Sequence, residues 1–501
     1  TEIYTHLILK QLKEKKQALF LLPEIALTTQ MIERMRRAFG QQVLVYHSKM
    51  PESRRSEVWQ RVLRGDPVVI VGARSALLLP FKRLGIVVVD EEHEPSYKQQ
   101  DPAPRYQARD AAIYLSHITQ AKVILGSATP SLESISNSQN GRFHKVELLK
   151  RFGDRPLPQL RLLPINQLQG HQQGIGNELE KAIERNLQSG RQVILFQNRR
   201  GFAPYIICED CGHIPQCPNC DISLSFHQYG QQLRCHYCGH KQKYLAHCTK
   251  CHSSKVHQQG IGTQRLEERL KSLFPNVGIE RLDTDSARGR QRLQKLIDDF
   301  ESGKTKILIG TQMVTKGLDF QNVGLVGIIS ADDLLSFPDF RNTERAYQLI
   351  AQVAGRAGRG AEEGQVLIQA RNTKHPLLKD LRDHAYARIY KREIYQRQAY
   401  AYPPFTRLIR ILLAHKDRDA VFHAARKMNG ILRTVFGNSL LGPEQPGAAR
   451  LKNRFLQQFM LKLPREYGNR QTKEALRKCL QEFEKHSVSK GIRVVLDVDP
   501  M

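Results

Sequence analysis

The stretch Ile86-Val87-Val88-Val89-Asp90-Glu91-Glu92-His93 constrains the fold more than any other part of the chain. A short, mostly β-branched apolar run after Gly85 predicts a strand buried on both faces, as in parallel α/β sheets. Ligands of such sheets bind just beyond the carboxyl ends of the strands, where Asp90 and Glu91 fall. An Asp there can hold Mg²⁺, and a neighbouring Glu can deprotonate a water that attacks a γ-phosphate. An ordinary solvated strand end has the same pattern, so other segments must decide.

The length and the net charge of the chain limit the number of domains and the class of partner that we expect. At 501 residues, a prior of roughly 150 residues per domain suggests three or four units. The net charge of 77 − 49 = +28 points to a polyanionic partner. No run of 18 apolar residues occurs and no basic amphipathic helix with an aromatic face stands out, so we expect a soluble, cytoplasmic protein with no membrane role.

Residues 1 to about 150 alternate short apolar strands with helices, which predicts a doubly wound parallel sheet. The expected strands are Ala18–Leu22, Val43–Tyr46, Val68–Val71, Ile86–Val89 and Val123–Leu125. Polar loops directly follow several of these strands and should lie along one edge of the sheet. There, Arg74 and Ser75 could meet phosphates, while Ser127 and Thr129 could hydrogen-bond back to the acidic turn.

The loop over residues 94–109 interleaves aromatic and cationic side chains. Its Tyr97, Lys98, Arg105 and Tyr106 are the residue types that stack on unpaired bases and hold phosphates. The alternative is a proline-rich surface loop whose tyrosines pack locally. The position of the loop after the acidic turn favours nucleic acid.

A second α/β region follows a loosely patterned linker at about residues 151–175. It begins with a helix near Glu178–Leu187 and a strand at Val193–Phe196, and it includes a strand at Lys306–Ile309. We expect a helix over Gln352–Gly360 that carries Arg356 and Arg359 on one face. Arginines that contact a transition-state γ-phosphate would explain this pattern, whereas a plain surface helix would lose stability at its three glycines.

Eight of the nine cysteines form four Cys-x-x-Cys pairs between residues 208 and 251, which predicts two structural Cys₄ zinc sites. Fourteen residues separate the two middle pairs, close to the spacing of zinc ribbons, whereas five separate the first pair from the second. Nested pairing is therefore expected: Cys208, Cys211, Cys248 and Cys251 on one zinc, and Cys217, Cys220, Cys235 and Cys238 on the other. The ninth, Cys479, is expected to be a small core residue.

The alternation of strands and helices typical of the first two regions stops near residue 385, and the remaining residues predict a small α+β domain. Strands are expected at Leu408–Ala414, Phe455–Leu463 and Ile492–Leu496, and helices near Ala420–Phe436 and Gln471–His486. At the other end, a helix that opens on Thr1 and precedes a strand is what remains when a phosphate-binding loop ending in Gly-Lys-Thr is cut before its last residue. We therefore expect the chain to be a fragment.

Three motifs in order, Asp-Glu-Glu-His (90–93), Gly-Ser-Ala-Thr-Pro (126–130) and Gln-Val-Ala-Gly-Arg-Ala-Gly-Arg (352–359), resemble those of superfamily 2 helicases. With Tyr97–Gln100, Asn198–Phe202, the eight cysteines and Pro338–Arg341, the chain is similar to the family of primosomal replication-restart helicases, the PriA (primosomal protein N′) family. The resemblance covers essentially the whole chain.

The resemblance implies an ATP-dependent 3′→5′ DNA helicase that recognises stalled or forked DNA and initiates primosome assembly. Its fold would be two RecA-like lobes, a zinc-binding insertion in the second lobe and an α+β C-terminal domain. The expected limits are 1–150, 151–207, 208–257, 258–385 and 386–501. Implied partners are forked and single-stranded DNA, primosome proteins and single-strand-binding proteins.

The resemblance also assigns residues. Thr1 would be a Mg²⁺-binding hydroxyl, Asp90 the second metal anchor and Glu91 the base, with ATP and Mg²⁺ as cofactors. Gln352, Arg356 and Arg359 would face the γ-phosphate, while Arg74, Thr311 and the 94–109 loop would track single-stranded DNA. Because most of the phosphate-binding loop would precede Thr1, we expect this chain alone to hydrolyse ATP barely or not at all. Two alternatives stay open, an RNA-directed helicase and a non-catalytic scaffold that binds forks.

Overall fold

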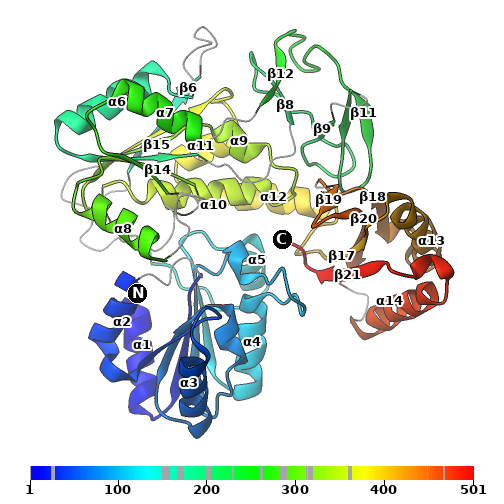
Figure 1. The fold of residues 1–501 in the computed structure, drawn as a ribbon, viewed down its shortest axis with the longest axis horizontal. Helices are drawn as coiled ribbons and strands as arrows, with labels where there is room; N and C mark the ends of the chain where they lie inside the picture. The colour runs from blue at the N-terminus through cyan, green and yellow to red at the C-terminus, as the bar shows by residue number, and fades with distance from the viewer. Residues whose placement is uncertain are drawn as a thin grey trace. The chain divides into compact units, whose positions relative to one another are not determined.

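The computed structural model describes residues 2–23, 29–148, 158–165, 174–197, 205–227, 231–259, 263–282, 290–311, 313, 320–358, 364–447, 449–465 and 469–501. The chain divides into two compact units, one built on residues 1–144 and the other on residues 145–315 and 320–500 (Figure 1). None of the described helices is both long and apolar enough to span a membrane.

The first unit is a five-stranded parallel sheet in the order β2-β3-β1-β4-β5 with helices on both faces. Its strands are β1 (Gln17–Leu21), β2 (Val43–Tyr46), β3 (Val69–Gly72), β4 (Leu84–Asp90) and β5 (Lys122–Gly126). Its helices are α1 (Glu2–Lys13), α2 (Thr29–Phe39), α3 (Glu52–Arg64), α4 (Ala108–Thr119) and α5 (Leu132–Gln139), with short 3₁₀ turns at Gly40–Gln42, Arg74–Leu78 and Pro95–Tyr97.

Alternation along β1 explains the two layers of this unit. Ala18 and Phe20 join the core that α1 and α2 cover, whereas Leu19 and Leu21 join the core that α3 and α4 cover. Side chains of a strand alternate between faces, so a strand covered on both sides must be apolar throughout. The predicted parallel sheet is therefore confirmed, and each predicted strand lies within two residues of an observed one.

The second unit contains a six-stranded parallel sheet in the order β13-β14-β7-β15-β16-β6. The strands are β6 (Gln159–Pro164), β7 (Gln192–Phe196), β13 (Ile279–Leu282), β14 (Ile307–Gly310), β15 (Val323–Ile328) and β16 (Gln365–Ala370). The helices are α6 (Asn177–Gln188), α7 (Thr263–Leu273), α8 (Arg290–Glu301), α9 (Ala331–Leu335), α10 (Asn342–Ala354), α11 (Pro376–Arg382) and α12 (Tyr386–Ala399).

Two expectations for this lobe are wrong. Residues 159–164 of the predicted linker form β6, the edge strand of the sheet, where Leu160 and Leu163 are buried. The predicted helix over Gln352–Gly360 is instead the end of α10, which stops at Ala354. Gly358 has a positive φ of 67°, a conformation that ends helices and that glycine adopts without strain.

The cysteine-rich insertion is built from short antiparallel strands: β8 (Tyr205–Cys208) pairs with β12 (Val256–Gln259), and β9 (Ser225–His227), β10 (Gln232–Arg234) and β11 (Lys241–Lys243) form a three-stranded sheet. The C-terminal segment is an antiparallel sheet of β17 (Thr406–His415), β18 (Leu440–Glu444), β19 (Arg450–Leu451), β20 (Arg454–Pro464) and β21 (Arg493–Val498), covered by α13 (Arg418–Phe436) and α14 (Asn469–Glu484) (Figure 1). This confirms the predicted α+β domain, and Cys479 is buried in its core as expected.

Candidate functional site

The acidic turn lies at the carboxyl edge of the first sheet. Asp90, the last residue of β4, pairs in register with Gly126, the last residue of β5, so the acidic turn and the Gly126–Pro130 loop begin side by side. A Cβ at position 126 would collide with the hydroxyl of Tyr4 from α1. Glycine at this position therefore lets α1 approach the end of the sheet.

Asp90 is a partly buried carboxyl group with a raised pKa. Burial, reinforced by the neighbouring Glu91, raises the pKa of Asp90 to about 6. The Tyr4 hydroxyl lies 3.4 Å from Asp90 Oδ1 and donates to it. Burial and the charge of Asp90 also raise the pKa of Tyr4, so that this hydroxyl keeps its proton and stays a donor.

Glu91 adopts a positive φ of 51°, which is rare for a residue with a side chain. Its side chain is 37% exposed, and its Oε2 lies 3.7 Å from Nδ1 of the buried His93. Non-glycine residues in this conformation concentrate at functional sites, where the surrounding structure holds the strain. The turn thus presents Glu91 to solvent while Asp90 stays half-enclosed.

His93 connects the acidic turn to the Gly126–Pro130 loop. Its Nδ1 lies 2.7 Å from the Ser127 hydroxyl, which in turn accepts a hydrogen bond from the Thr129 backbone N–H at 2.9 Å. The backbone N–H of Glu92 donates to the Gly126 carbonyl at 3.0 Å. The expected link from Ser127 to the acidic turn is therefore present, and Thr129 joins it through Ser127.

Glu92 is the residue that sequence reasoning missed. It is 1% exposed, and one oxygen accepts from the Ser131 N–H at 2.6 Å. The other accepts from the hydroxyls of Ser131 (3.1 Å) and Ser134 (3.0 Å) and from Arg109 Nη1 (3.1 Å). The sequence pattern gives no sign of this network. Glu92 lies on the acidic turn, Arg109 on α4, and Ser131 and Ser134 at the start of α5, and only the folded sheet brings these segments together.

The 94–109 loop is tied to the lobe more tightly than its composition indicated. Tyr97 is fully buried, with its hydroxyl 2.6 Å from the Asp90 carbonyl and 3.0 Å from the Leu21 carbonyl. Lys98 is 2% exposed and donates to the Arg105 carbonyl at 2.8 Å. In this structure neither side chain presents a face to a base, and the local packing left open as the alternative describes both.

The remaining predicted DNA contacts differ in exposure. Arg74 donates to the Lys98 carbonyl at 2.7 Å, and Tyr106 donates to the Arg74 carbonyl at 3.2 Å, so the two side chains also brace the loop. Ser75, Arg105 and Tyr106 are partly exposed, whereas Thr311 is 6% exposed just after β14. Roles for these residues in binding DNA stay predictions.

The second-lobe residues assigned to the γ-phosphate are only partly described. Gln352 lies in the last turn of α10, and Arg356, 9% exposed, lies in the turn that follows it. The predicted shared helical face is therefore absent. Thr1, Arg359 and the Asn198–Phe202 motif lie outside the described residues.

The eight clustered cysteines converge on two points of the insertion. Within each quartet, the sulfur atoms lie within 4.8 Å of one another. The outer cluster is Cys208, Cys211, Cys248 and Cys251, and the inner cluster is Cys217, Cys220, Cys235 and Cys238. These are the two sets that nested pairing predicts. Four convergent thiols form the donor set of a closed tetrahedral Zn²⁺ site, so the residues present fit structural zinc.

Comparisons with known protein families match most of the chain. A DEAD/DEAH box helicase model matches residues 1–138, and a helicase conserved C-terminal domain model matches residues 238–361. A PriA DNA helicase Cys-rich region model matches residues 217–243, which hold the inner cluster, and a primosomal protein N C-terminal domain model matches residues 398–501.

Two relatives of known family give the same assignment. The chain is 38% identical to the replication restart protein PriA of Bacillus subtilis, covering 100% of this chain and 62% of that protein. It is 39% identical to the Haemophilus influenzae protein of the same name, covering 100% of this chain and 68% of the relative. Among solved structures, RecG bound to a three-way DNA junction aligns over 79% of this chain and 42% of RecG, with a TM-score of 0.45 and 13% identity.

Proposed function

Because the chain belongs to the PriA family of replication restart proteins, we propose that it is the motor portion of an ATP-dependent DNA helicase that acts in replication restart. The acidic turn at the edge of the first sheet is the observation that carries this proposal, because it places Asp90 and Glu91 where α/β sheets bind nucleotides. Two parallel sheets, each matched by a helicase family model, support it.

The residues of the first lobe fit the proposed chemistry. Mg²⁺ bound with ATP would neutralise charge that develops on the transferred phosphoryl group, and the Asp90 carboxylate, together with Thr1, would hold it. Glu91, displayed by its positive φ, would orient and deprotonate the attacking water. The Tyr4 hydroxyl would fix the orientation of the Asp90 carboxylate through their hydrogen bond.

The Glu92 and His93 contacts suggest how a change at the nucleotide site would be passed on within the first lobe. Both side chains join the acidic turn to the Gly126–Ser131 loop, His93 through Ser127 and Glu92 through Ser131. Segments held together by several short hydrogen bonds move together when either one is displaced. We therefore assign this network to coupling between the acidic turn and the Gly126–Ser131 loop.

Finer parts of the proposal rest on the family. They include 3′→5′ polarity, recognition of forked DNA, and assembly with primosome and single-strand-binding proteins. Roles for Gln352, Arg356 and Arg359 at the γ-phosphate belong with them, as do DNA contacts by Arg74, Ser75, Arg105, Tyr106 and Thr311. The expected domain limits also stay predictions.

The test is DNA-stimulated ATP hydrolysis by the full-length gene product, with Glu91→Gln and the exposed Glu57→Gln as a matched pair. We expect Glu91→Gln to bind nucleotide normally and to hydrolyse it about 10²–10⁴-fold more slowly, because general-base catalysis contributes about that factor. Glu57→Gln should leave the rate unchanged. Normal turnover by Glu91→Gln would remove it from the base role. A wild-type protein that binds forks without hydrolysing ATP would favour the non-catalytic scaffold. Unwinding of RNA forks as fast as DNA forks would favour the RNA-directed helicase.

A further inference from the structure

The two cysteine clusters sit in different environments although their ligands are identical. In the inner cluster, Cys217 and Cys220 are 1% exposed and Cys235 is fully buried. In the outer cluster, Cys251 is exposed and Cys211 is partly exposed. A thiolate that solvent can reach meets oxidants and chelators directly, whereas one inside a packed core is shielded until that core opens.

The inner cluster is part of a core that the insertion shares with the C-terminal sheet. Its cysteines pack in one apolar cluster with Phe340, Tyr402, Leu408 and Met460. The Tyr402 hydroxyl donates to the Cys220 carbonyl at 2.9 Å, and its ring stacks on Phe340 with centroids 4.3 Å apart. Lys462 Nζ lies 3.8 Å from the centre of the Tyr402 ring, which places a cation beside the cluster and opposes its thiolate charge.

Polar contacts also join the inner cluster to the C-terminal segment. The His236 ring nitrogen Nδ1 lies 2.8 Å from the Gln445 carbonyl, and the Gln458 amide donates to the His236 carbonyl at 2.7 Å. Arg234, on the strand that leads into Cys235, forms an ion pair with the buried Glu444. Releasing a ligand from the inner cluster would therefore disturb the packing of the C-terminal domain.

The outer cluster is held by its own turns and, outside the insertion, touches Asn372, against which Gly212 packs. The Gly212 N–H donates to the Cys208 carbonyl at 2.9 Å, and the His252 N–H donates to the Cys248 carbonyl at 3.0 Å. Cys251, between the exposed Lys250 and His252, lies open to solvent.

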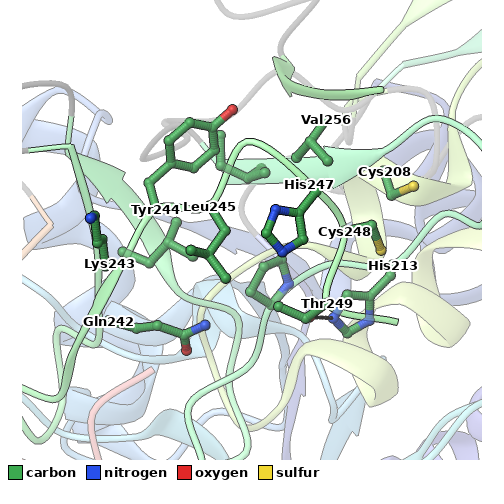
Figure 2. Close-up of a pocket in the computed structure, with 13 residues that line it drawn as sticks. Cys208, His213, Gln242, Lys243, Tyr244, Leu245, His247, Cys248, Thr249 and Val256 are labelled. Carbon is green, nitrogen blue, oxygen red and sulfur yellow. Dashed lines mark hydrogen bonds between the residues drawn. The ribbon is translucent and has the colours of Figure 1, made fainter. Parts of the chain in front are cut away.

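A small pocket reaches the remaining ligands of the outer cluster. Cys208 and Cys248 line it together with His213, Tyr244 and Thr249, and Figure 2 shows Cys248 and His213 close to Thr249 at one end of this pocket. Its volume is about 20 Å³, enough for a water-sized molecule, which needs about 10–15 Å³. Solvent can therefore reach this cluster directly at the exposed Cys251, and a water-sized molecule fits beside the buried Cys208 and Cys248.

We propose that the outer cluster is an oxidation-sensitive, exchangeable zinc site, whereas the inner cluster holds its zinc as a permanent part of the fold. An outer thiolate attacks an oxygen of a two-electron oxidant of the hydroperoxide class and becomes a sulfenic acid, and a second thiolate of the quartet then attacks that sulfur, forms the disulfide and expels hydroxide. Two thiolates, one hydrogen peroxide and two protons give one disulfide and two waters. With two of its four ligands oxidised, the outer site releases Zn²⁺. The proposal requires bound zinc and does not depend on helicase activity.

The test follows zinc release from the full-length, zinc-loaded protein during titration with hydrogen peroxide, with a chromogenic chelator present. Mass spectrometry after alkylation identifies which cysteines are oxidised at each step. We expect one zinc to leave at least about tenfold faster than the other, with the outer quartet oxidised first and the buried Cys479 unmodified. Release of both zincs at one rate, or earlier oxidation of the inner quartet, would overturn the proposal.

A matched pair of variants gives a second readout. Cys251→Ser and Cys238→Ser each remove an accessible ligand of one quartet, since Cys238 is the partly exposed member of the inner cluster. We expect Cys251→Ser to purify with one zinc and to keep the melting temperature of the C-terminal domain. Cys238→Ser should lower that temperature or prevent recovery of folded protein. Equal melting temperatures for the two folded variants would contradict the assignment.

Discussion

Replacing Glu92 with glutamine should destabilise the first lobe more than a change of one atom suggests. Four donors point at this carboxylate: the Ser131 N–H, the hydroxyls of Ser131 and Ser134, and Arg109 Nη1. Glutamine offers one acceptor oxygen and two N–H groups, so at least one donor faces another donor. Arg109, whose own side chain is 12% exposed, also loses the buried counter-charge of Glu92.

The expected magnitude follows from this geometry. Removing one partner of a buried ion pair costs about 3–5 kcal/mol, chiefly because the other charge stays buried. Asp110 still contacts Arg109 Nε at 2.9 Å, but its side chain is 54% exposed and compensates only partly. We therefore expect the lower end of that range, about 3 kcal/mol. With a urea dependence of about 2 kcal/mol per molar, the unfolding midpoint should fall by about 1.5 M.

The assay uses the one tryptophan of the chain. Trp59 lies on α3 and is 41% exposed, so its fluorescence reports unfolding of the first lobe separately from the second unit. Urea titrations would compare wild type, Glu92→Gln and the exposed control Glu57→Gln, which should shift the free energy of unfolding by no more than about 0.5 kcal/mol. An unfolding midpoint for Glu92→Gln that matches the control would refute the claim that the Glu92 carboxylate stabilises the first lobe. A double-mutant cycle with Arg109→Met would then show no coupling.

Three further outcomes are expected. Tyr97→Phe should lower the stability of the first lobe by about 1–3 kcal/mol in the same fluorescence assay, because the Leu21 and Asp90 carbonyls lose the single hydroxyl proton that they share; an unchanged midpoint would contradict this. Burial raises the pKa of Glu393 from 4.5 to about 7, so the native state binds the extra proton and stability falls as pH rises through this window. The free energy of unfolding of Glu393→Gln, relative to that of wild type, should therefore rise by up to about 3 kcal/mol between pH 5 and pH 8, as measured by calorimetry. A difference that does not change with pH would refute this. Finally, affinity for single-stranded DNA should fall by about 0.7 log units per log unit of salt for each phosphate contacted, and salt-independent binding in a fluorescence-anisotropy titration would count against the phosphate interface.

The sheets were predictable because their strands are covered on both sides. A strand with no solvent-facing residues needs a continuous apolar run, and Ile86–Val89 and Val193–Phe196 show such runs in the sequence alone. The edge strand β6 was not predicted, because Gln159 and Arg161 face solvent and only every second or third residue of this strand is buried. Edge strands carry half the apolar signal of central ones, so composition assigned this one to a linker.

Side-chain roles were less predictable than backbone order. Tyr97 and Lys98 have the composition of a base-stacking loop, yet Tyr97 reaches the Leu21 carbonyl, 76 residues earlier in the chain. The helix over residues 352–360 was wrong for a local reason: α10 stops at Ala354, Gly355 caps it, and Arg356 lies in the turn beyond. The glycines that would destabilise a plain surface helix mark the end of this one.

The cysteine insertion shows where spacing stops being informative. Ligand sets follow from the lengths of chain between Cys-x-x-Cys pairs, because a five-residue connection restricts which knuckles can share an ion. The spacing of the cysteines does not indicate which residues pack over each cluster. Tyr402, whose hydroxyl donates to the Cys220 carbonyl, lies 182 residues further along the chain, and Gln458, which donates to His236, lies 222 residues away. Two quartets that look equivalent in sequence thus acquire different exposure only when the C-terminal sheet packs against one of them. Differences in metal exchange between them should therefore disappear in variants that loosen the C-terminal sheet from the inner cluster.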